Sequence, residues 1–453
     1  MTKLRWYAVA ATVAALGLML AMAHPALRGA VLSGGGWLAE PWADPSPSPG
    51  PSNCPVSEKL VPECGAWWGV APGVFTSTPS AQALTEFEIK TDRHADIYHR
   101  YHRGDELFPT EDEIAAARDP NGPRVLLLNW KVAWGTTWAD VAAGGQDARI
   151  DRLAAHVNET FDEPFFLAIH HEPENDVRTE AESGMTAADY AAMYRHTVER
   201  LRAQGVDNAV YVMAYMGWQG WGTKPWFDEL YPGDDVVDWI GYDPYVTADP
   251  DAYHHGDFAT LVNQTDDPKT WPGFYDWATA EHPGKPLMLA EWGVFEYPDD
   301  HGRKADIFAS VERQLPDFPA LKALVYFDSP NAPKGDTRID SSKQALEVFR
   351  DLAALPLFSI IFPGTPGDPS PSASPSGAPG SPSLDPSGSP SPAVSGSPSP
   401  GAASPSAASP SVSLSQGASP SPSATVSPNP AASSAPPAST RPRQIPLRRL
   451  SRR

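Results

Sequence analysis

The chain has only two cysteines in 453 residues, and its last 91 residues, from Pro363, contain no Trp, Tyr, Cys or His. Those last residues hold 22 of the 51 prolines, interleaved with Ser and Ala. A segment so poor in bulky apolar side chains cannot bury enough surface to offset the entropy of ordering its backbone. The composition therefore predicts a disordered tail over 364–453. A second Pro-rich patch, which ends at residue 52, predicts a linker over 24–52.

Positive charge is scarce in the remaining body, residues 53–363, whose 311 residues suffice for one large core. The whole chain carries −21, yet the part from Gly364 onward contributes +4 (six Arg, two Asp) and residues 1–52 contribute +1. The body therefore carries −26. Such a charge repels phosphate backbones and anionic membranes, so we expect no nucleic-acid partner.

The N-terminus has the pattern of an export signal. Residues 1–5 are basic, and the next 18, from Trp6 to Ala23, are uncharged, mostly apolar, and end in Ala-Met-Ala. This order is typical of a secretory signal peptide over 1–23. Eighteen residues also approach the minimum for a membrane-spanning helix, so an uncleaved signal anchor is the alternative. Either one predicts a secreted or cell-envelope-associated body.

Two further features bear on that compartment. In an exported chain Cys54 and Cys64 are expected to form a disulfide, and two free buried thiols are the alternative. Two cysteines alone cannot make a zinc site, and we expect no metal or other cofactor. The tail ends in a basic segment, RPRQIPLRRLSRR. It is either a spacer that crosses a cell wall and touches anionic polymer, or a solubilising tail with no partner.

Apolar runs of strand length alternate with segments of helical period along the whole body. Eight strands are predicted, at 65–70, 95–101, 124–130, 164–170, 209–215, 236–242, 286–292 and 321–327, with helices such as 186–205 and 304–315 between them. Eight such units in about 300 residues predict an α/β fold, a single (β/α)8 TIM barrel with catalytic function. A doubly wound open sheet shows the same alternation, but its usual Gly-rich phosphate turn is absent.

Polar and aromatic residues gather where the predicted strands end, which is where barrel enzymes place their sites. These residues are His99, His102, Trp130, His170, His171, Glu172, Tyr242, Asp243, Tyr245, Glu291 and Trp292. Glu172 and Glu291 each follow a buried apolar strand, the fourth and the seventh. A single glutamate at such a position is more often a structural salt bridge or cap, but two of them can face one cleft. Two carboxylates flanking a cleft are what glycosidic hydrolysis needs.

Several segments together resemble glycoside hydrolase family 26, a family of barrel enzymes. They are NWK (129–131), GGQDARIDRLAAHV (144–157), HHE (170–172), YPGDDVVDWIGYDPY (231–245) and KPLMLAEWG (285–293). The resemblance extends over roughly 124–293. It implies Glu172 as the catalytic acid/base and Glu291 as the nucleophile of a retaining mechanism. It also implies that His171 lies beside the reacting sugar, that Tyr245 donates a hydrogen bond to the nucleophile, and that Trp130 lines the sugar cleft.

Three further residues are candidates for substrate binding. Trp218 lies in a Trp-rich segment after the fifth strand, and Trp292 follows Glu291; aromatic faces suit pyranose rings, although both can equally be core residues. His102 can meet substrate hydroxyls, but a structural histidine is nearly as good an interpretation. The chain departs from the family pattern after the acid/base (PENDVRTE), after strand five (MAYMGW) and at the end of strand eight (YFDS). These departures bear on which sugar is bound.

The sequence thus predicts a secreted, monomeric, retaining endo-glycosidase that acts on a β-linked polysaccharide. The family's commonest substrate is β-1,4-mannan. Mixed-linkage β-glucan, β-1,3-xylan or a cell-envelope polysaccharide are alternatives, and a non-catalytic carbohydrate-binding relative is a rival from another class. A metal-dependent hydrolase on the same barrel is disfavoured, because the first strand has no His-x-His pair.

Overall fold

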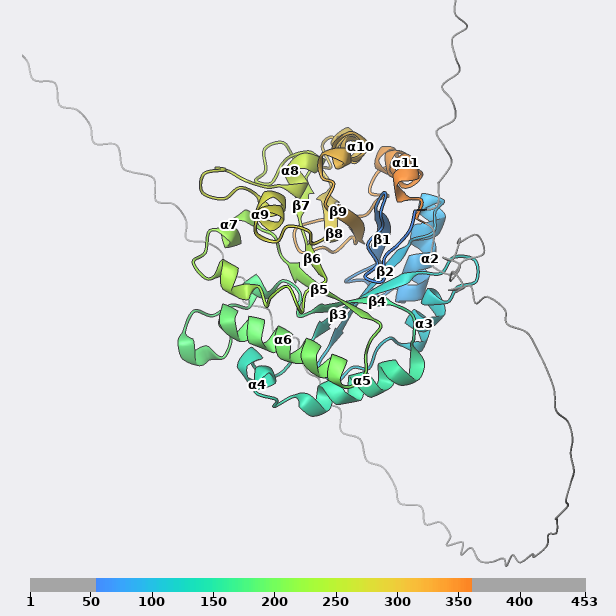
Figure 1. The fold of residues 1–453 in the computed structure, drawn as a ribbon. Coiled ribbons are helices and arrows are strands. Elements are labelled where there is room, and N and C mark those ends of the chain that lie inside the picture. Colours follow the sequence, from blue (N-terminus) through green and yellow to red (C-terminus); the bar gives the residue numbers. More distant parts are fainter. Residues whose placement is uncertain (1–53, 361–453) are drawn as a thin grey trace, which may run out of the picture. The chain divides into compact units, whose positions relative to one another are not determined.

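The computed structural model describes residues 54–360, which are drawn in colour in Figure 1. The predicted signal segment (1–23), linker (24–52) and tail (364–453) lie outside the described residues. Within 54–360, no helix is both long enough and apolar enough to cross a membrane.

Parallel strands form a closed barrel at the centre of the described body (Figure 1). The order in the sheet is β6-β5-β4-β3-β2-β1-β9-β8, and pairing of β6 with β8 closes the ring. The short strand β7 pairs with the end of β8. The closure confirms the predicted (β/α)8 barrel and excludes an open doubly wound sheet. The bounds are β1 Trp67–Pro72, β2 Ile97–Arg103, β3 Val125–Lys131, β4 Phe165–Ile169, β5 Ala209–Tyr215, β6 Trp239–Tyr242, β7 Tyr245–Thr247, β8 Leu287–Phe295 and β9 Leu321–Asp328.

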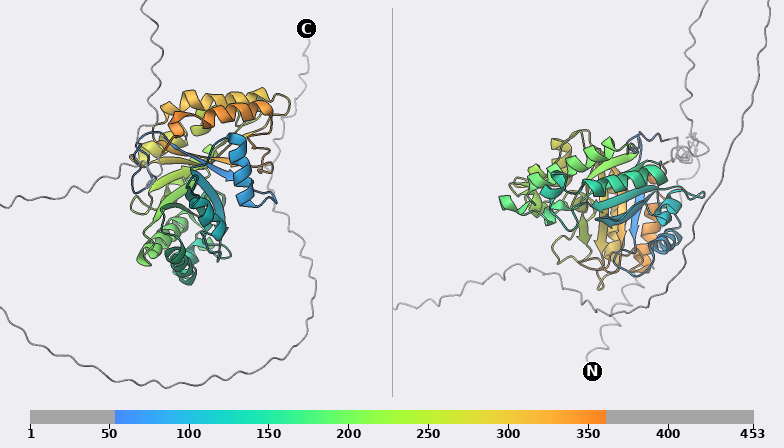
Figure 2. Two further views of the ribbon diagram at one scale, coloured as in Figure 1. Left: turned by 90° about the vertical axis from the view of Figure 1, so that its right-hand side faces the viewer. Right: turned by 90° about the horizontal axis from the view of Figure 1, so that it is seen from below.

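Helices follow the strands and cover the outside of the barrel, and Figure 2 shows α10 and α11 lying side by side in orange. Thr110 and Thr186 begin α3 and α6 with capping boxes, in which side chains satisfy the free N–H groups of the first turn. The α-helices are α2 Ser80–Thr91, α3 Glu111–Ala117, α4 Trp138–Ala142, α5 Asp147–Thr160, α6 Ala187–Ala203, α7 Gln219–Gly222, α8 Phe258–Val262, α9 Phe274–Glu281, α10 Gly302–Gln314 and α11 Lys343–Ala353. Short 3-10 helices occupy Pro173–Asn175, Ala181–Ser183, Phe227–Leu230, Leu315–Asp317 and Pro356–Phe358.

Side chains along each strand alternate between the barrel interior and the layer under the helices. On β3, Val125 and Leu127 belong to the interior cluster, whereas Leu126, Leu128 and Trp130 belong to the larger cluster outside it. This alternation decides which residues at a strand end face the mouth of the barrel.

Strand β8 breaks the alternation just where the second glutamate stands. Its pairing register with β9 shifts between Leu289 and Trp292. Ala290 lies in the interior cluster and Trp292 in the outer one, although the two are an even number of residues apart. A β-bulge of this kind re-aims side chains, and here it lets Glu291 follow Ala290 into the barrel mouth.

The segment before β1 covers the end of the barrel where the strands begin. Leu60 is fully buried in the interior cluster, and its carbonyl accepts a hydrogen bond from Trp67 Nε1 at 2.7 Å. Trp239 Nε1 donates to the Lys59 carbonyl, also at 2.7 Å. Cys54 and Cys64 form a disulfide at the two ends of this segment, as predicted. We call residues 54–64 the bottom plug.

Candidate active site

A cavity of about 730 Å³ occupies the opposite end of the barrel, where the strands end. Glu172, after β4, and Glu291, in β8, both line it. The other lining residues come from the ends of nearly all strands and include Phe75, Tyr101, His102, Asn129, Lys131, Trp134, His171, Asp243, Tyr245 and Lys334. The fold therefore brings the two predicted carboxylates, 119 residues apart in sequence, onto one cavity.

Glu291 is buried and is held from both sides by tyrosine hydroxyls. Tyr101 donates to its Oε1 and Tyr245 to its Oε2, each at 2.7 Å. Burial and the neighbouring charge of Glu172 raise the pKa of Glu291 to about 7, and the two tyrosine hydrogen bonds lower it. Both donors favour the ionised form, because a hydroxyl that points at a carboxylate stabilises its charge.

Glu172 is half-buried and has a different environment. Its side chain accepts one hydrogen bond, from Asn175 Nδ2 to Oε2 at 3.1 Å. Burial raises the pKa of Glu172, while the Lys131 ammonium and the Asn175 hydrogen bond lower it. Its backbone adopts φ +51°, a left-handed conformation that is unusual for a residue other than glycine and that is found at functional sites. The Glu172 N–H donates to the Ala214 carbonyl at 2.9 Å and so fixes this turn against β5.

The two environments favour one proton shared between two carboxyl groups. Glu291 has two hydroxyl donors and Glu172 has a single amide donor. The two hydroxyl donors therefore favour the ionised form of Glu291 more strongly than the single amide donor favours that of Glu172. Pairs of titratable groups whose surroundings separate their pKa values are characteristic of acid and base assignments in enzymes.

Two more groups border this pair. Burial and Lys131 lower the pKa of His171 to about 3, so its ring is neutral. His171 lines the cavity, while its Nδ1 atom is buried and has no hydrogen-bond partner within 54–360. Burial and the charges of Glu291 and Glu172 raise the pKa of Asp243 well above its usual value, so this carboxyl is neutral. Within the same residues, no three His, Cys, Asp or Glu side chains form a group that could hold a metal ion.

The structure corrects the placement of two predicted tryptophans. Trp130 is fully buried outside the barrel, where its Nε1 donates to the Gly104 carbonyl at 3.1 Å. Trp292 is also fully buried, and its ring packs against Tyr326 and Phe349 under the helices. Neither side chain lines the cavity, because strand alternation turns Trp130 outward and the β8 bulge turns Trp292 outward.

The remaining predicted residues take intermediate positions. His102 reaches the rim of the cavity, but its Nε2 lies 3.0 Å from Glu113 Oε1 and its ring stacks on Phe108. These contacts agree with the structural interpretation of this histidine. Trp218 does not line the main cavity and instead lines a smaller one beside it. His99 is buried beneath the site, next to Asn129.

Three residues of the site are missing from the sequence predictions. Tyr101 was obscured by the histidines around it, although it occupies the same face of β2 as Ile97 in the interior. Trp134 is 52% exposed and lines the cavity under the Arg103 guanidinium. Glu174 is buried, and its carboxyl accepts the N–H groups of Met216 and Gly217 at 3.0–3.3 Å. Glu174 thereby joins the turn that carries Glu172 to the end of β5.

Comparison with known families agrees with this geometry. Residues 141–270 match the model of glycosyl hydrolase family 26. The resemblance to glycoside hydrolase family 26 is confirmed. The family-26 match includes His171, Glu172, Asp243 and Tyr245, whereas Glu291 lies beyond it on β8.

Individual relatives are distant. Endoglucanase H of Acetivibrio thermocellus is 25% identical over 323 residues, which cover 68% of this chain and 33% of that protein. The chain thus spans about a third of the length of this relative. Among solved structures, a ruminal family-26 endo-β-1,4-mannanase is 16% identical, with 64% and 63% of the two chains covered and a TM-score of 0.44. A family-26 β-mannanase from Bacteroides ovatus is also 16% identical, with 66% and 91% covered and a TM-score of 0.43.

Proposed function

We propose that this chain is a retaining glycoside hydrolase that cleaves a β-linked polysaccharide, with Glu172 as acid/base and Glu291 as nucleophile. The observation that supports it best is the contrast between two glutamates on one cavity. Two tyrosine hydroxyls stabilise the charge of Glu291, while Glu172 has a single amide donor. A double displacement needs one ionised carboxylate as nucleophile and one protonated carboxyl as acid.

In the first step the Glu291 carboxylate attacks the anomeric carbon, and Glu172 transfers its proton to the departing glycosidic oxygen. The sugar is then held as an ester of Glu291, and Glu172 is ionised. In the second step Glu172 takes a proton from a water molecule, whose oxygen attacks the same carbon. The ester bond breaks, and Glu291 regains its charge. His171, a neutral side chain on the cavity wall, is suited to contact a hydroxyl of the reacting sugar.

For the substrate we propose β-1,4-mannan, which the family resemblance favours, with cleavage inside the chain. Mixed-linkage β-glucan is the second candidate, because the similar protein of Acetivibrio thermocellus is an endoglucanase. β-1,3-Xylan and a cell-envelope polysaccharide are the remaining alternatives. The sequence patterns of residues 1–23 and 364–453 support action outside the cell. We further propose that the protein is a monomer whose tail contacts the wall.

A panel of these polymers tests the substrate. The full-length chain is incubated with each polymer, and new reducing ends are measured. Hydrolysis of mannan in preference to the other polymers is expected. Binding of a polymer without hydrolysis would instead support a non-catalytic carbohydrate-binding protein.

Two variants test the catalytic roles. Glu291→Ala removes the attacking atom, so no substrate should be hydrolysed. Glu172→Ala removes only the proton donor, so an activated aryl glycoside should still release its phenol, and azide should speed turnover and give a glycosyl azide of retained configuration. Glu180→Ala, an exposed glutamate of the same loop, is the control and should keep full activity. Equal behaviour of the Glu172 and Glu291 variants, or an inverted first product, would contradict the assignment.

A further inference from the structure

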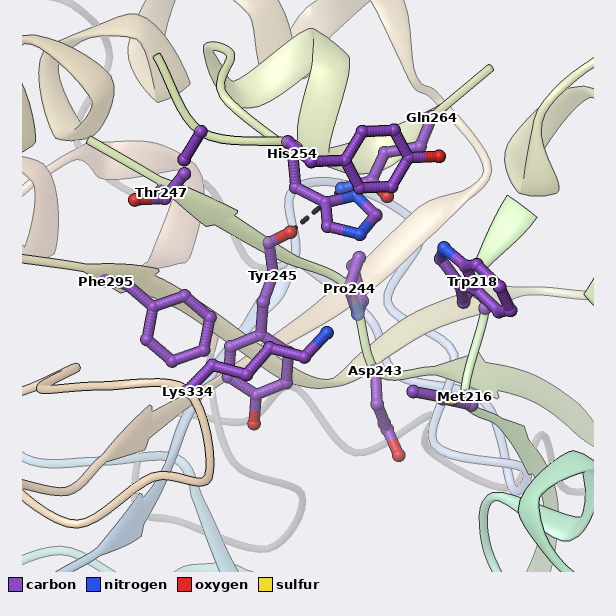
Figure 3. Close-up of a pocket in the computed structure, with 13 residues that line it drawn as sticks. Met216, Trp218, Asp243, Pro244, Tyr245, Thr247, His254, Gln264, Phe295 and Lys334 are labelled. Atoms are coloured by element: carbon purple, nitrogen blue, oxygen red, sulfur yellow. Dashed lines mark hydrogen bonds between the residues drawn. The ribbon is translucent and has the colours of Figure 1, made fainter. Parts of the chain in front are cut away.

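A second cavity, of about 210 Å³, opens beside the main one and is drawn in Figure 3. The two cavities share Met216, Asp243, Tyr245, Phe295 and Lys334, but neither Glu172 nor Glu291 lines the second one. Its other lining residues include Trp218, Tyr253, His254 and Gln264. We call it the side pocket. The mechanism above does not use it, and its wall 216–218 belongs to a segment in which this chain departs from the family pattern.

One wall of the side pocket is an exposed aromatic ring held in a fixed position. Tyr253 is 59% exposed. Its hydroxyl accepts a hydrogen bond from Gln219 Nε2 at 2.6 Å and donates one to Asp266 Oδ2 at 2.9 Å. A ring anchored at its polar end presents its apolar surface to solvent and loses little freedom when a ligand covers it. These are the properties of a binding surface.

The opposite walls supply a second aromatic ring and a cation. Trp218 packs edge-on against Trp221 with ring centres 5.5 Å apart, after a bend at Gly217 with φ +73°. Figure 3 shows the Lys334 side chain reaching across the pocket toward Pro244. The Lys334 ammonium makes no hydrogen bond or salt bridge to any residue of the described body, so its three N–H donors are free to meet a ligand.

We propose that the side pocket binds one further sugar ring of the polysaccharide, next to the ring that reacts at Glu291. Tyr253 and Trp218 contact the apolar faces of that ring, and Lys334 donates to its hydroxyls. A few polar groups on mostly apolar walls are characteristic of such sites. The net charge of −26 disfavours an acidic ring, so the ring is neutral. It belongs either to the main chain or to a branch.

The proposal rests on the proposed function and is tested with oligosaccharides of the polymer that the full-length chain degrades. Tyr253→Ala should lower kcat/KM about tenfold, equivalent to about 1.4 kcal/mol, mainly through KM. The shortest aryl glycoside has a single sugar ring and so no second sugar to place in the pocket, and its kcat/KM should change less than about twofold. Tyr253→Phe keeps the ring and should retain most activity. Lys334→Ala should show the same fall in kcat/KM as Tyr253→Ala. The control is Ile89→Ala, at a side chain 72% exposed on α2, which should leave kcat/KM unchanged.

Linear and branched oligosaccharides with the same backbone distinguish the two sources of the ring. If Tyr253→Ala lowers kcat/KM on both linear and branched oligosaccharides, the pocket binds a main-chain ring. If it lowers kcat/KM on branched oligosaccharides only, the pocket binds a branch. Calorimetric binding to Glu291→Ala protein, with and without Tyr253→Ala, tests the pocket without hydrolysis. If oligosaccharides bind in a way that depends on Tyr253 but the parent chain does not hydrolyse them, the proposed function is overturned and the pocket is supported. Unchanged kcat/KM and Kd in Tyr253→Ala, or an equal loss with the shortest aryl glycoside, would overturn the pocket.

Discussion

At the scale of single residues, the site depends on hydrogen-bond donors that set the charge of a buried carboxylate. Glu291 lies in a buried place that favours its neutral form, and the hydroxyls of Tyr101 and Tyr245 oppose that preference. Each donor stabilises the carboxylate and leaves the neutral acid less favoured. The two tyrosines therefore keep the carboxylate form of Glu291, the proposed nucleophile, available over a wider range of pH.

Removing either donor should shift the pH profile in a known direction. In Tyr101→Phe or Tyr245→Phe the ionised form of Glu291 loses a donor, so the pKa of Glu291 rises. The acid limb of kcat/KM should move upward by about one to two pH units, since a hydrogen bond to a charged group contributes about 1.5–3 kcal/mol and one unit corresponds to about 1.4 kcal/mol. Profiles from pH 5 to 9 measure it.

The control for this shift is Tyr211→Phe. The Tyr211 hydroxyl is buried on β5 without a hydrogen-bond partner in the described body, and the side chain lines neither cavity. Its profile should match that of the parent chain. A shift to lower pH in Tyr101→Phe or Tyr245→Phe, or equal profiles in all three variants, would show that these hydroxyls do not hold the charge of Glu291.

At the scale of elements, the bottom plug and the cavity lie at opposite ends of the barrel. The plug contributes Leu60 to the interior cluster, and its backbone accepts hydrogen bonds from Trp67 and Trp239 at the starts of β1 and β6. The disulfide between Cys54 and Cys64 closes the plug. We therefore expect stability and catalysis to depend on separate ends of the same strands, as is usual in such barrels.

Opening the disulfide should lower stability without changing catalysis. The Cys54→Ser/Cys64→Ser variant frees a loop of about ten residues in the unfolded chain. The free energy of unfolding should fall by up to about 3 kcal/mol. Urea unfolding measures this loss, and kcat/KM on the preferred polymer should stay the same. Alkylation of two thiols in the non-reduced parent chain, or a large loss of kcat/KM in the variant, would contradict this account.

At the scale of the whole molecule, the composition predicts a body that forms a core and a tail that does not. The body has all of the Trp and Tyr residues beyond position 52, while the part from Gly364 has none. The charges differ as well, at −26 for the body and +4 for that part. We therefore expect the body to fold and act without its tail.

Deleting residues 364–453 should leave the enzyme nearly unchanged. The melting temperature should shift by less than about 2 °C, and the specific activity on soluble polymer should be the same. A shorter chain that ends at Ser342 is the control. It loses α11 with the buried Phe349, so its melting temperature should fall strongly. A large fall on deleting the tail alone would show that the tail packs on the barrel.

Much of this protein could be read from its sequence, because local patterns determine local structure. The alternation of strand-length and helix-period segments predicted all eight barrel strands, and the resemblance to family 26 pointed to Glu172, Glu291 and Tyr245. The Cys54–Cys64 pairing followed from the cysteine count and the predicted export signal. Each of these features depends on residues that are close together in sequence or few in number.

Which way a side chain faces was decided only by the tertiary structure. Trp130 and Trp292 stand at strand ends like Glu172 and Glu291, yet both are buried under the helices. Tyr101, between two histidines, turns inward to Glu291 instead. A strand shows the same period of two whichever face is inside. On β8 the register shift interrupts that period, so Ala290 and Trp292 face opposite sides although they are two residues apart. Only the closure of the barrel fixes the inner face, because it makes one set of side chains fill the interior.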